Sequence, residues 1–287
     1  MGMIIRPPGS DETQDLRRIW TSAFGNGDES AFFSYYFKPE YCLTAVCDGL
    51  PVSAGYLLPV GRLDHDNGER VSCAMIYGVA VLPRYRGRGF GTMVVRELVS
   101  QGKEYGAIAL CPSDDSLFRY YRDCADFCDW FYTHERRLSS PPRVAASKIS
   151  AVTPLEYSRL REKLLADVPH IAMDLHALGY QETLCQTFGG GLFMLDSPGR
   201  ASCAVVERQK NGAILIKELL SPNGCEDYMI ASIAAAFPAK EYWVRTPTHR
   251  TDGSRNCRRF GMLAAAPVMD GNADMNGFTP WFGLAFD

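Results

Sequence analysis

The hydrophobic pattern changes sharply along residues 75–100. Residues 75–82 form an apolar run rich in β-branched side chains, which predicts a buried strand, and Pro83 ends it. Residues 84–91 then alternate arginine with glycine, a composition typical of a loop. The spacing of apolar residues over 92–100 predicts a helix. The expected order is therefore strand, basic glycine-rich loop and helix.

The rest of the first half is predicted to mix helices with antiparallel strands. Ser10 can cap a helix whose apolar stripe runs from Leu16 to Phe24. The aromatic segment 30–37 predicts a second helix; its rings favour core packing, with substrate binding as the alternative. A turn at Asp48-Gly49 joins two alternating segments. Residues 112–115 cap a further helix, and the expected strands are 3–6, 43–47, 52–63, 107–111 and 131–138.

The second half repeats this outline after a linker signal at residues 139–142. Thr153 and Glu156 form a capping box with Pro154 at the first helical position. Another helix is expected over 226–237, and the last residues, 281–287, have a strand-like pattern. The other expected strands are 192–195, 201–207, 213–220 and 242–246, with turns at Pro198-Gly199 and Asn211-Gly212.

Composition narrows the functional classes. The 287 residues suffice for two domains, and a net charge of −3 gives no general attraction for nucleic acid or an anionic membrane. We find no signal peptide and no apolar run long enough to span a membrane, so a cytoplasmic location is expected. The ten cysteines and five histidines are scattered; Cys42 with Cys47 and Cys124 with Cys128 have spacings that could hold a metal, but no further ligand completes either set, which predicts no metal site.

The loop at 84–91 carries the chemistry that this pattern suggests. Three glycines allow the backbone to curl and present successive N–H groups at the start of a helix, where an anion is stabilised. Arginines at 84, 86 and 88 add positive charge. No lysine follows the last glycine, which excludes a P-loop, and the glycine spacing fits a dinucleotide fingerprint badly. An ordinary surface turn remains the alternative.

The spacing Arg86-x-x-Gly89-x-Gly91, directly after the strand GVAVLP, resembles motif A of the GNAT superfamily of acetyl-CoA-dependent N-acetyltransferases. The resemblance implies an α+β GNAT fold, with a mixed central sheet flanked by helices, over a catalytic domain at residues 1–138. A linker at 139–152 and a degenerate GNAT-like domain at 153–287 would follow, because 221–224 lacks the motif. This pairing is similar to the enhanced-intracellular-survival acetyltransferases.

The resemblance also implies a set of residues that bind acetyl-CoA as cosubstrate, with no metal. The loop would hold the pyrophosphate, and the end of the preceding strand would pair with the pantetheine chain. The backbone N–H of Val79 or Val81 would donate a hydrogen bond to the oxyanion of the tetrahedral intermediate. The implied binding residues are Val79, Ala80, Val81, Arg86, Gly87, Arg88, Gly89, Phe90, Gly91, Thr92 and Ser113.

The segment LFRYYRDCADF resembles the family's motif B, whose tyrosine donates a proton to the leaving thiolate. The resemblance implies Tyr121 as this general acid, with Tyr120 as the alternative, and it places Ala125 and Asp126 where glycine and phenylalanine are usual. Acetyl transfer to a small or peptide primary amine is the expected function; the alternative is a non-catalytic acyl-CoA-binding sensor or scaffold.

The general base and the amine stay open at this stage. Water, Glu40 and the terminal carboxylate of Asp287 are all candidate bases. Phe33, Tyr36 and Asp64 are candidates for the amine pocket, which would suit an apolar and cationic substrate. The sequence does not define the oligomeric state.

Overall fold

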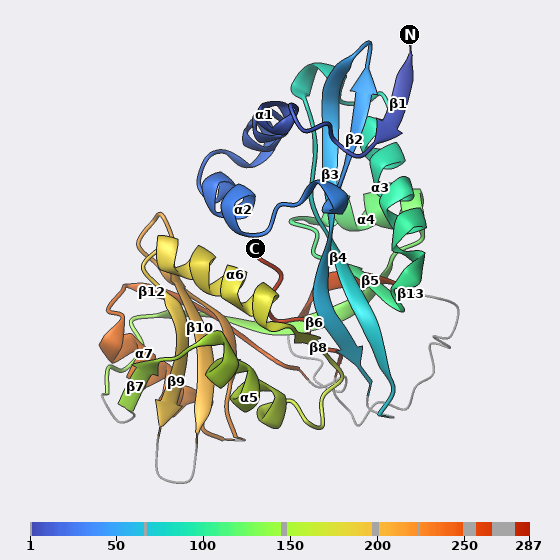
Figure 1. Cartoon of the computed structure of the whole chain (residues 1–287). Coiled ribbons are helices and arrows are strands. Elements are labelled where there is room, and N and C mark those ends of the chain that lie inside the picture. Colours follow the sequence, from blue (N-terminus) through green and yellow to red (C-terminus); the bar gives the residue numbers. More distant parts are fainter. Residues whose placement is uncertain are drawn as a thin grey trace. The chain divides into compact units, whose positions relative to one another are not determined.

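The computed structural model describes residues 2–65, 68–144, 148–196, 201–222, 224–248, 257–265 and 279–287 (Figure 1). The α-helices are α1 (Thr13–Phe24), α2 (Glu29–Tyr35), α3 (Phe90–Gln101), α4 (Asp115–Ala125), α5 (Pro154–Leu164), α6 (Leu175–Thr187) and α7 (Glu226–Ala236). Short 3₁₀ helices are η1 (Pro39–Tyr41), η2 (Pro83–Tyr85) and η3 (Gly102–Glu104). The expected turn at Pro198-Gly199 and the loop residues Asp66 and Asn67 lie outside the described residues.

The strands alternate with these helices in the α+β order that the sequence predicts. They are β1 (Met3–Arg6), β2 (Cys42–Cys47), β3 (Leu50–Asp64), β4 (Arg70–Val81), β5 (Ala107–Leu110), β6 (Cys128–Ser139), β7 (Lys148–Ala151), β8 (His170–Met173), β9 (Gly191–Asp196), β10 (Ser202–Arg208), β11 (Ile214–Leu220), β12 (Glu241–Thr246) and β13 (Cys257–Ala265).

The chain divides into two compact units. The first contains residues 1–62, 71–129 and 261–271, and the second contains 63–70, 130–260 and 272–287. The expected linker at 139–152 includes β7, which pairs antiparallel with β9 and so contributes to the sheet of the second unit.

The first unit has a mixed sheet with strand order β1-β2-β3-β4-β5-β13. Strands β1, β2 and β3 are antiparallel, and the β2–β3 hairpin turns at Asp48 and Gly49, which both have positive φ. In contrast, β4 pairs with β5 in parallel. The predicted hairpin turn is therefore confirmed, and the parallel strands β4 and β5 are connected through α3.

Helices cover both faces of this sheet (Figure 1). On one face, α3 and α4 bury an aliphatic core against the strands, formed by residues such as Leu57, Ile76, Val94 and Phe118. On the other, Trp20 of α1 stacks on Phe32 of α2 with ring centroids 4.4 Å apart. Adjacent residues of one strand point to opposite faces, so each strand supplies both cores.

Two sequence expectations about this aromatic face are corrected or refined. Phe33 and Tyr36 are buried, and the Tyr36 hydroxyl donates to the carbonyl of Pro59. These two rings therefore belong to the core and not to an amine pocket.

Ser10 does not cap α1. The N-cap position is Glu12, which makes no side-chain cap, and its carboxylate instead accepts two 2.7 Å hydrogen bonds from Arg6.

The second unit has the strand order β6-β12-β11-β10-β9-β7. Its core lies between this sheet and α7, with Ile214, Ile216 and Met229 fully buried. Helices α5 and α6 pack against β9 and β10. The capping box at Thr153 is confirmed, because Thr153 accepts from the Glu156 amide at 3.3 Å and its own amide donates back to Glu156 at 2.9 Å.

A buried ionic network replaces apolar packing in part of the second unit. Glu218 of β11 is fully buried, and it accepts hydrogen bonds from Arg161 at 2.9 Å, Tyr157 at 2.8 Å and Trp281 at 2.6 Å. Residues after the Trp281 bridge to His170 have no regular strand structure, so the expected final strand is wrong. Instead, the Phe282 carbonyl accepts from Arg161 and the Asp287 side chain pairs with Arg245.

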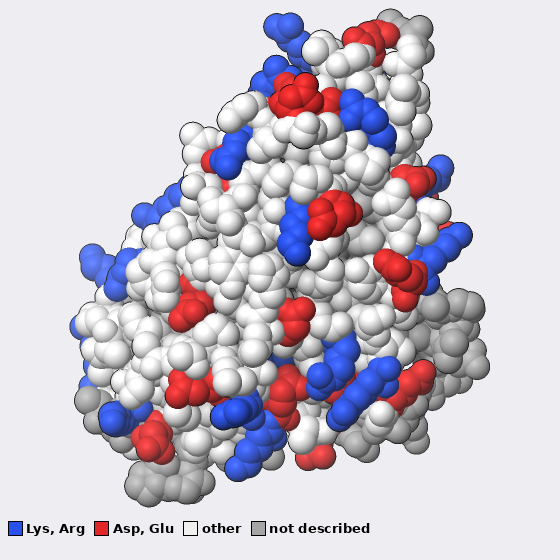
Figure 2. Space-filling view, viewed as in Figure 1, with Lys and Arg blue, Asp and Glu red and all other residues white. Residues whose placement is uncertain are grey.

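Charged side chains of both signs are interspersed on the face of the molecule drawn in Figure 2. That distribution agrees with the small net charge of −3. Among the described residues, no helix has the length and apolar character needed to cross a membrane.

Candidate active site

A glycine interrupts β4 shortly before its end. Gly78 has a left-handed φ of 59°, and a Cβ there would lie 2.6 Å from the Trp20 ring. The parallel ladder with β5 runs through Cys73–Met75, before this position. An irregular, positive-φ residue inside a strand ends regular pairing. The ladder with β5 therefore ends before Val79, while the carbonyls of Ala80 and Val81 accept from Ser53 and Arg86.

The loop after β4 curls through two left-handed glycines. Gly87 has a φ of 73° and Gly89 a φ of 83°, values that cost other residues free energy. Gly89 is also the N-cap of α3, so the first amides of this helix have no partner within it. No acidic residue lies in the first turn of α3. The loop thus ends in an electropositive helix N-terminus that suits an anion.

The arginines of the loop differ in what they contact. The Arg86 Nε donates to the carbonyl of Val81 at 3.1 Å, which ties the loop back to the end of β4. The Arg88 guanidinium lies 5.4 Å from the centre of the Tyr85 ring, in a cation–π arrangement. Arg86 therefore shapes the loop as well as charging it.

A cavity of about 460 Å³ opens where this loop, the end of β4 and α4 meet. Its volume lies within the usual range for small-molecule sites. Its lining residues are Val79, Val81, Tyr85, Arg86, Gly87, Gly89, Phe90, Gly91, Thr92, Leu117, Tyr120 and Tyr121. Most of the residues that the sequence suggested for acetyl-CoA, and both candidate tyrosines, thus line one cavity.

Three of the suggested residues do not line it. Ala80 points to the other face of β4 and is buried, and its carbonyl accepts from Ser53 at 2.8 Å. Arg88 lies over Tyr85, and the Ser113 hydroxyl lies 3.3 Å from the Asp114 carboxylate at the start of α4.

Sequence reasoning did not select Tyr85 and Leu117 as lining residues. Tyr85 belongs to the short helix η2, and its ring meets that of Phe90 edge to face, with centroids 6.0 Å apart. Leu117 lies in the first turn of α4. Its spacing with Tyr121 along that helix was a signal that could have suggested it, because residues four apart share a helix face.

The two tyrosines of α4 have different surroundings. The Thr92 hydroxyl donates to the Tyr120 oxygen at 3.4 Å, and a Cβ at Gly91 would lie 3.2 Å from that oxygen. Tyr121 packs edge to face on Tyr120 and Phe127. Within the described chain, the Tyr121 hydroxyl forms no hydrogen bond that would compete with a ligand. Burial raises the pKa of both phenols, that of Tyr121 well above its ordinary value.

The end of α4 lies one residue further along than the place that motif B suggests for it. Asp126 is the C-cap, with a left-handed φ of 56°, and Phe127 after it is buried. A left-handed residue followed by a buried ring is the local structure that a Gly-Phe pair provides. Asp126 and Phe127 have this local structure, and Ala125 is the last helical residue.

None of the protein groups considered as a general base lines this cavity. Glu40 is exposed on η1. Asp287 belongs to the second unit, where its side chain pairs with Arg245 at 2.5 Å and its carbonyl accepts from Lys217. Asp64, which the sequence suggested for the amine pocket, also belongs to the second unit and does not line this cavity.

Comparison with known proteins agrees with this geometry. Residues 4–123 match the family model of the acetyltransferase (GNAT) domain. No curated protein sequence matches the chain significantly.

Solved structures match over most of the chain at low identity. A GCN5-related N-acetyltransferase from Anabaena variabilis is 13% identical, with 92% of this chain and 73% of that one covered and a TM-score of 0.68. Eis1 from Mycobacterium abscessus is 14% identical, with the same coverage and a TM-score of 0.61. A tandem GNAT protein from the clavulanic acid biosynthesis pathway is 13% identical, with 94% of this chain and 100% of that one covered and a TM-score of 0.54.

Residues 4–123 thus match the acetyltransferase (GNAT) domain, and the fold of the chain is similar to that of tandem GNAT proteins.

Proposed function

We propose that this chain is an N-acetyltransferase that moves the acetyl group of acetyl-CoA to a primary amine of a small molecule or peptide, with Tyr121 as the general acid. The observation that carries the proposal is that one cavity is lined by the end of β4, the N-terminus of α3 and two tyrosines. These features supply, in order, backbone pairing, an anion site and a proton donor.

The residues present fit coenzyme A. A pyrophosphate suits the loop between Gly87 and Gly91, where backbone amides and the start of α3 stabilise negative charge. The backbone of β4 beyond Gly78 can add the extended pantetheine chain as a further strand. Val79 and Val81 line the cavity, and their amides are the proposed donors to the oxyanion.

Proton transfer then decides the role of the tyrosine. When an amine attacks the thioester carbonyl, the carbon–sulfur bond breaks and the thiolate needs a proton. Because burial raises the pKa of Tyr121, its phenol stays protonated at neutral pH and can donate. The Tyr120 side chain accepts from Thr92 and also hydrogen-bonds to Cys124. Among the described residues the Tyr121 hydroxyl has no such partner, so we assign Tyr121 as the donor to a ligand.

The deciding experiment combines calorimetry with an assay for released thiol. The full chain should bind coenzyme A and should release free thiol from acetyl-CoA in the presence of a panel of primary amines. Gly91→Val should weaken coenzyme A binding at least about 100-fold. An added Cβ lies 3.2 Å from the Tyr120 hydroxyl and 3.3 Å from Val81, so the valine side chain would crowd the cavity beside the loop amides.

Gly2→Val is the control for this variant. Gly2 is exposed and nothing lies within 4 Å of a Cβ added there, so the variant should keep coenzyme A affinity. Absence of coenzyme A binding by the wild type would refute the proposal. Binding without thiol release on any amine would instead favour the alternative of a non-catalytic acyl-CoA sensor.

A further inference from the structure

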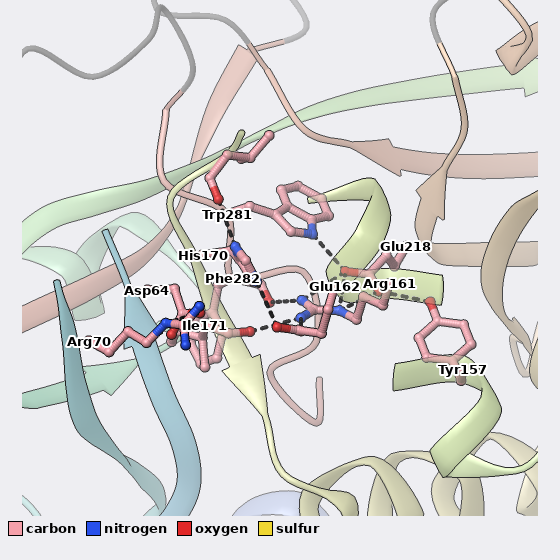
Figure 3. Close-up of polar contacts among 11 residues, drawn as sticks. Asp64, Arg70, Tyr157, Arg161, Glu162, His170, Ile171, Glu218, Trp281 and Phe282 are labelled. Atoms are coloured by element: carbon pink, nitrogen blue, oxygen red, sulfur yellow. Dashed lines mark hydrogen bonds and ion pairs between the residues drawn. The ribbon is translucent and has the colours of Figure 1, made fainter. Parts of the chain in front are cut away.

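A histidine and two carboxylates meet in the second unit, and none of them lines the cavity described above (Figure 3). Asp64 ends β3, Glu162 lies on α5 and His170 begins β8. One ligand atom from each lies within 4.8 Å of the others. Three segments that are distant in sequence therefore bring oxygen, oxygen and nitrogen donors to one point.

The hydrogen bonds of His170 fix which ring nitrogen faces the carboxylates. Its Nδ1 lies 2.6 Å from the carbonyl oxygen of Val168, and a carbonyl can only accept, so Nδ1 carries a proton. In the neutral ring, Nε2 then has a lone pair. That atom lies 3.3 Å from Glu162 Oε2, which is also an acceptor. Two acceptors at this separation require a cation between them.

Either a proton or a metal ion can meet this requirement, and the separation also suits a metal ion. Zinc binds imidazole nitrogen and carboxylate oxygen at about 2.0–2.1 Å, so two ligands of a tetrahedral zinc lie about 3.3 Å apart. The separation of Nε2 and Oε2 has this value. A metal-binding histidine also commonly donates its other N–H to a backbone carbonyl, as His170 does to Val168.

Two arginines lie near the carboxylates of this cluster. Arg161 contacts the other oxygen of Glu162 at 3.5 Å, but its shorter bonds at 2.9 Å go to Glu218. Arg70 lies 3.5 Å from Asp64, longer than a good charge-assisted hydrogen bond. His170 is buried and held by the backbone, whereas the Glu162 side chain is 29% exposed and can adjust.

From these contacts we infer that Asp64, Glu162 and His170 bind a zinc ion, with water as a fourth ligand. A nitrogen donor favours zinc over magnesium or calcium, which prefer oxygen ligands alone. The ion would link the end of β3, α5 and β8 within the second unit. This site is independent of the proposed acetyl transfer.

Calorimetric titration of the metal-stripped full chain with Zn²⁺ tests the inference. We expect one site, whose affinity falls at least about 100-fold in Glu162→Gln and in His170→Gln, since each loses a ligand. Glu162→Gln keeps the size of a part-exposed side chain, so it gives a result even if His170→Gln does not fold. Titration with Co²⁺ should produce visible absorption without a thiolate charge-transfer band.

Two control variants remove exposed side chains that could bind zinc outside the proposed site. His176→Gln changes an exposed histidine on α6, and Cys128→Ser removes an exposed thiol. Both should retain the site. If the wild type binds no zinc, or if the same affinity persists in Glu162→Gln, the inference is wrong and the cation beside His170 is a proton.

Discussion

The two units contain the same local arrangement, a parallel pair of strands in which a loop and a helix follow the first strand, but the residues around it differ. In the first, β4 pairs in parallel with β5 over Cys73–Met75, and in the second, β11 pairs in parallel with β12 over Ile214–Ile216. A loop and a helix follow each strand. Beyond the paired residues, β4 contains the left-handed Gly78, whereas β11 contains the buried charged residues Lys217 and Glu218.

The difference continues into the helices. The first turn of α3 has no acidic residue and follows a left-handed glycine, whereas α7 begins with Glu226 and Asp227. Negative charge at a helix N-terminus repels an anionic ligand. The comparison shows how one topology can supply an anion site in one unit and a self-contained ionic core in the other.

The largest expected effect concerns the ionic core of the second unit. Glu218→Ala leaves Arg161 buried without its carboxylate, so we expect the free energy of unfolding to fall by about 3–5 kcal/mol. Chemical denaturation measures this change. Glu241→Ala, which removes the partner of exposed Arg137, should cost far less, because solvent screens an exposed pair. Equal costs for the two variants would contradict our reading of the network.

The next effect concerns the proton donor of the first unit. Tyr121→Phe should lower kcat at least about 100-fold, the usual contribution of a general acid, with little change in coenzyme A affinity. Tyr120→Phe is the matched variant and should lose less. If Tyr120→Phe proves the more damaging of the two, the roles assigned to these neighbours are reversed.

The pH profile of the wild type sharpens this assignment. Burial raises the pKa of Tyr121, so the donating phenol persists below that raised value and is lost only above it. We therefore expect no alkaline fall in kcat caused by Tyr121 below pH about 10, the ordinary value for tyrosine. Steady-state rates across alkaline pH check this, and a fall near pH 8 that disappears in Tyr121→Phe would contradict it.

A smaller effect should follow when the charge of α7 is copied onto α3. Thr92→Asp places a carboxylate in the first turn of α3 and should weaken coenzyme A binding about tenfold, through repulsion of the pyrophosphate. Thr92→Asn separates this effect from loss of the contact with Tyr120. Similar affinities of the two variants in calorimetry would show that helix-terminal charge does not distinguish the units.

The smallest expected effect is the converse change. Asp227→Asn removes an acid from the first turn of α7 and its 3.0 Å ion pair with Arg136. Stability should fall by about 0.3–1 kcal/mol, measured by thermal unfolding, because this side chain is exposed. No second coenzyme A site should appear in calorimetry, since α7 has no left-handed glycine at its N-cap.

Features that depend on neighbouring residues were predictable from the sequence. The β2–β3 hairpin, the capping box at Thr153 and the order around motif A all follow from local spacing. Helix α6 was missed because its buried residues include the consecutive run 177–181, so it has no single apolar stripe. Strand β8 was also missed, although the equally short strands β1 and β5 were predicted.

Features that depend on residues distant in sequence were not predictable. Glu218, Arg161 and Trp281 meet only after the second unit folds, and each alone looks like an ordinary surface or core residue. The same holds for Asp64 and His170, which share no ligand spacing along the chain. For the candidate site, the loop and the tyrosines were found because a local motif carried them.

Gly78 has a consequence for how related chains can diverge. A side chain at this position would need to displace the indole of Trp20, which a Cβ would approach to 2.6 Å. Positions 20 and 78 should therefore vary together: chains that replace this glycine should carry a smaller residue in place of the tryptophan. Such chains would also be expected to have lost the ability to take an acyl carrier beside that strand.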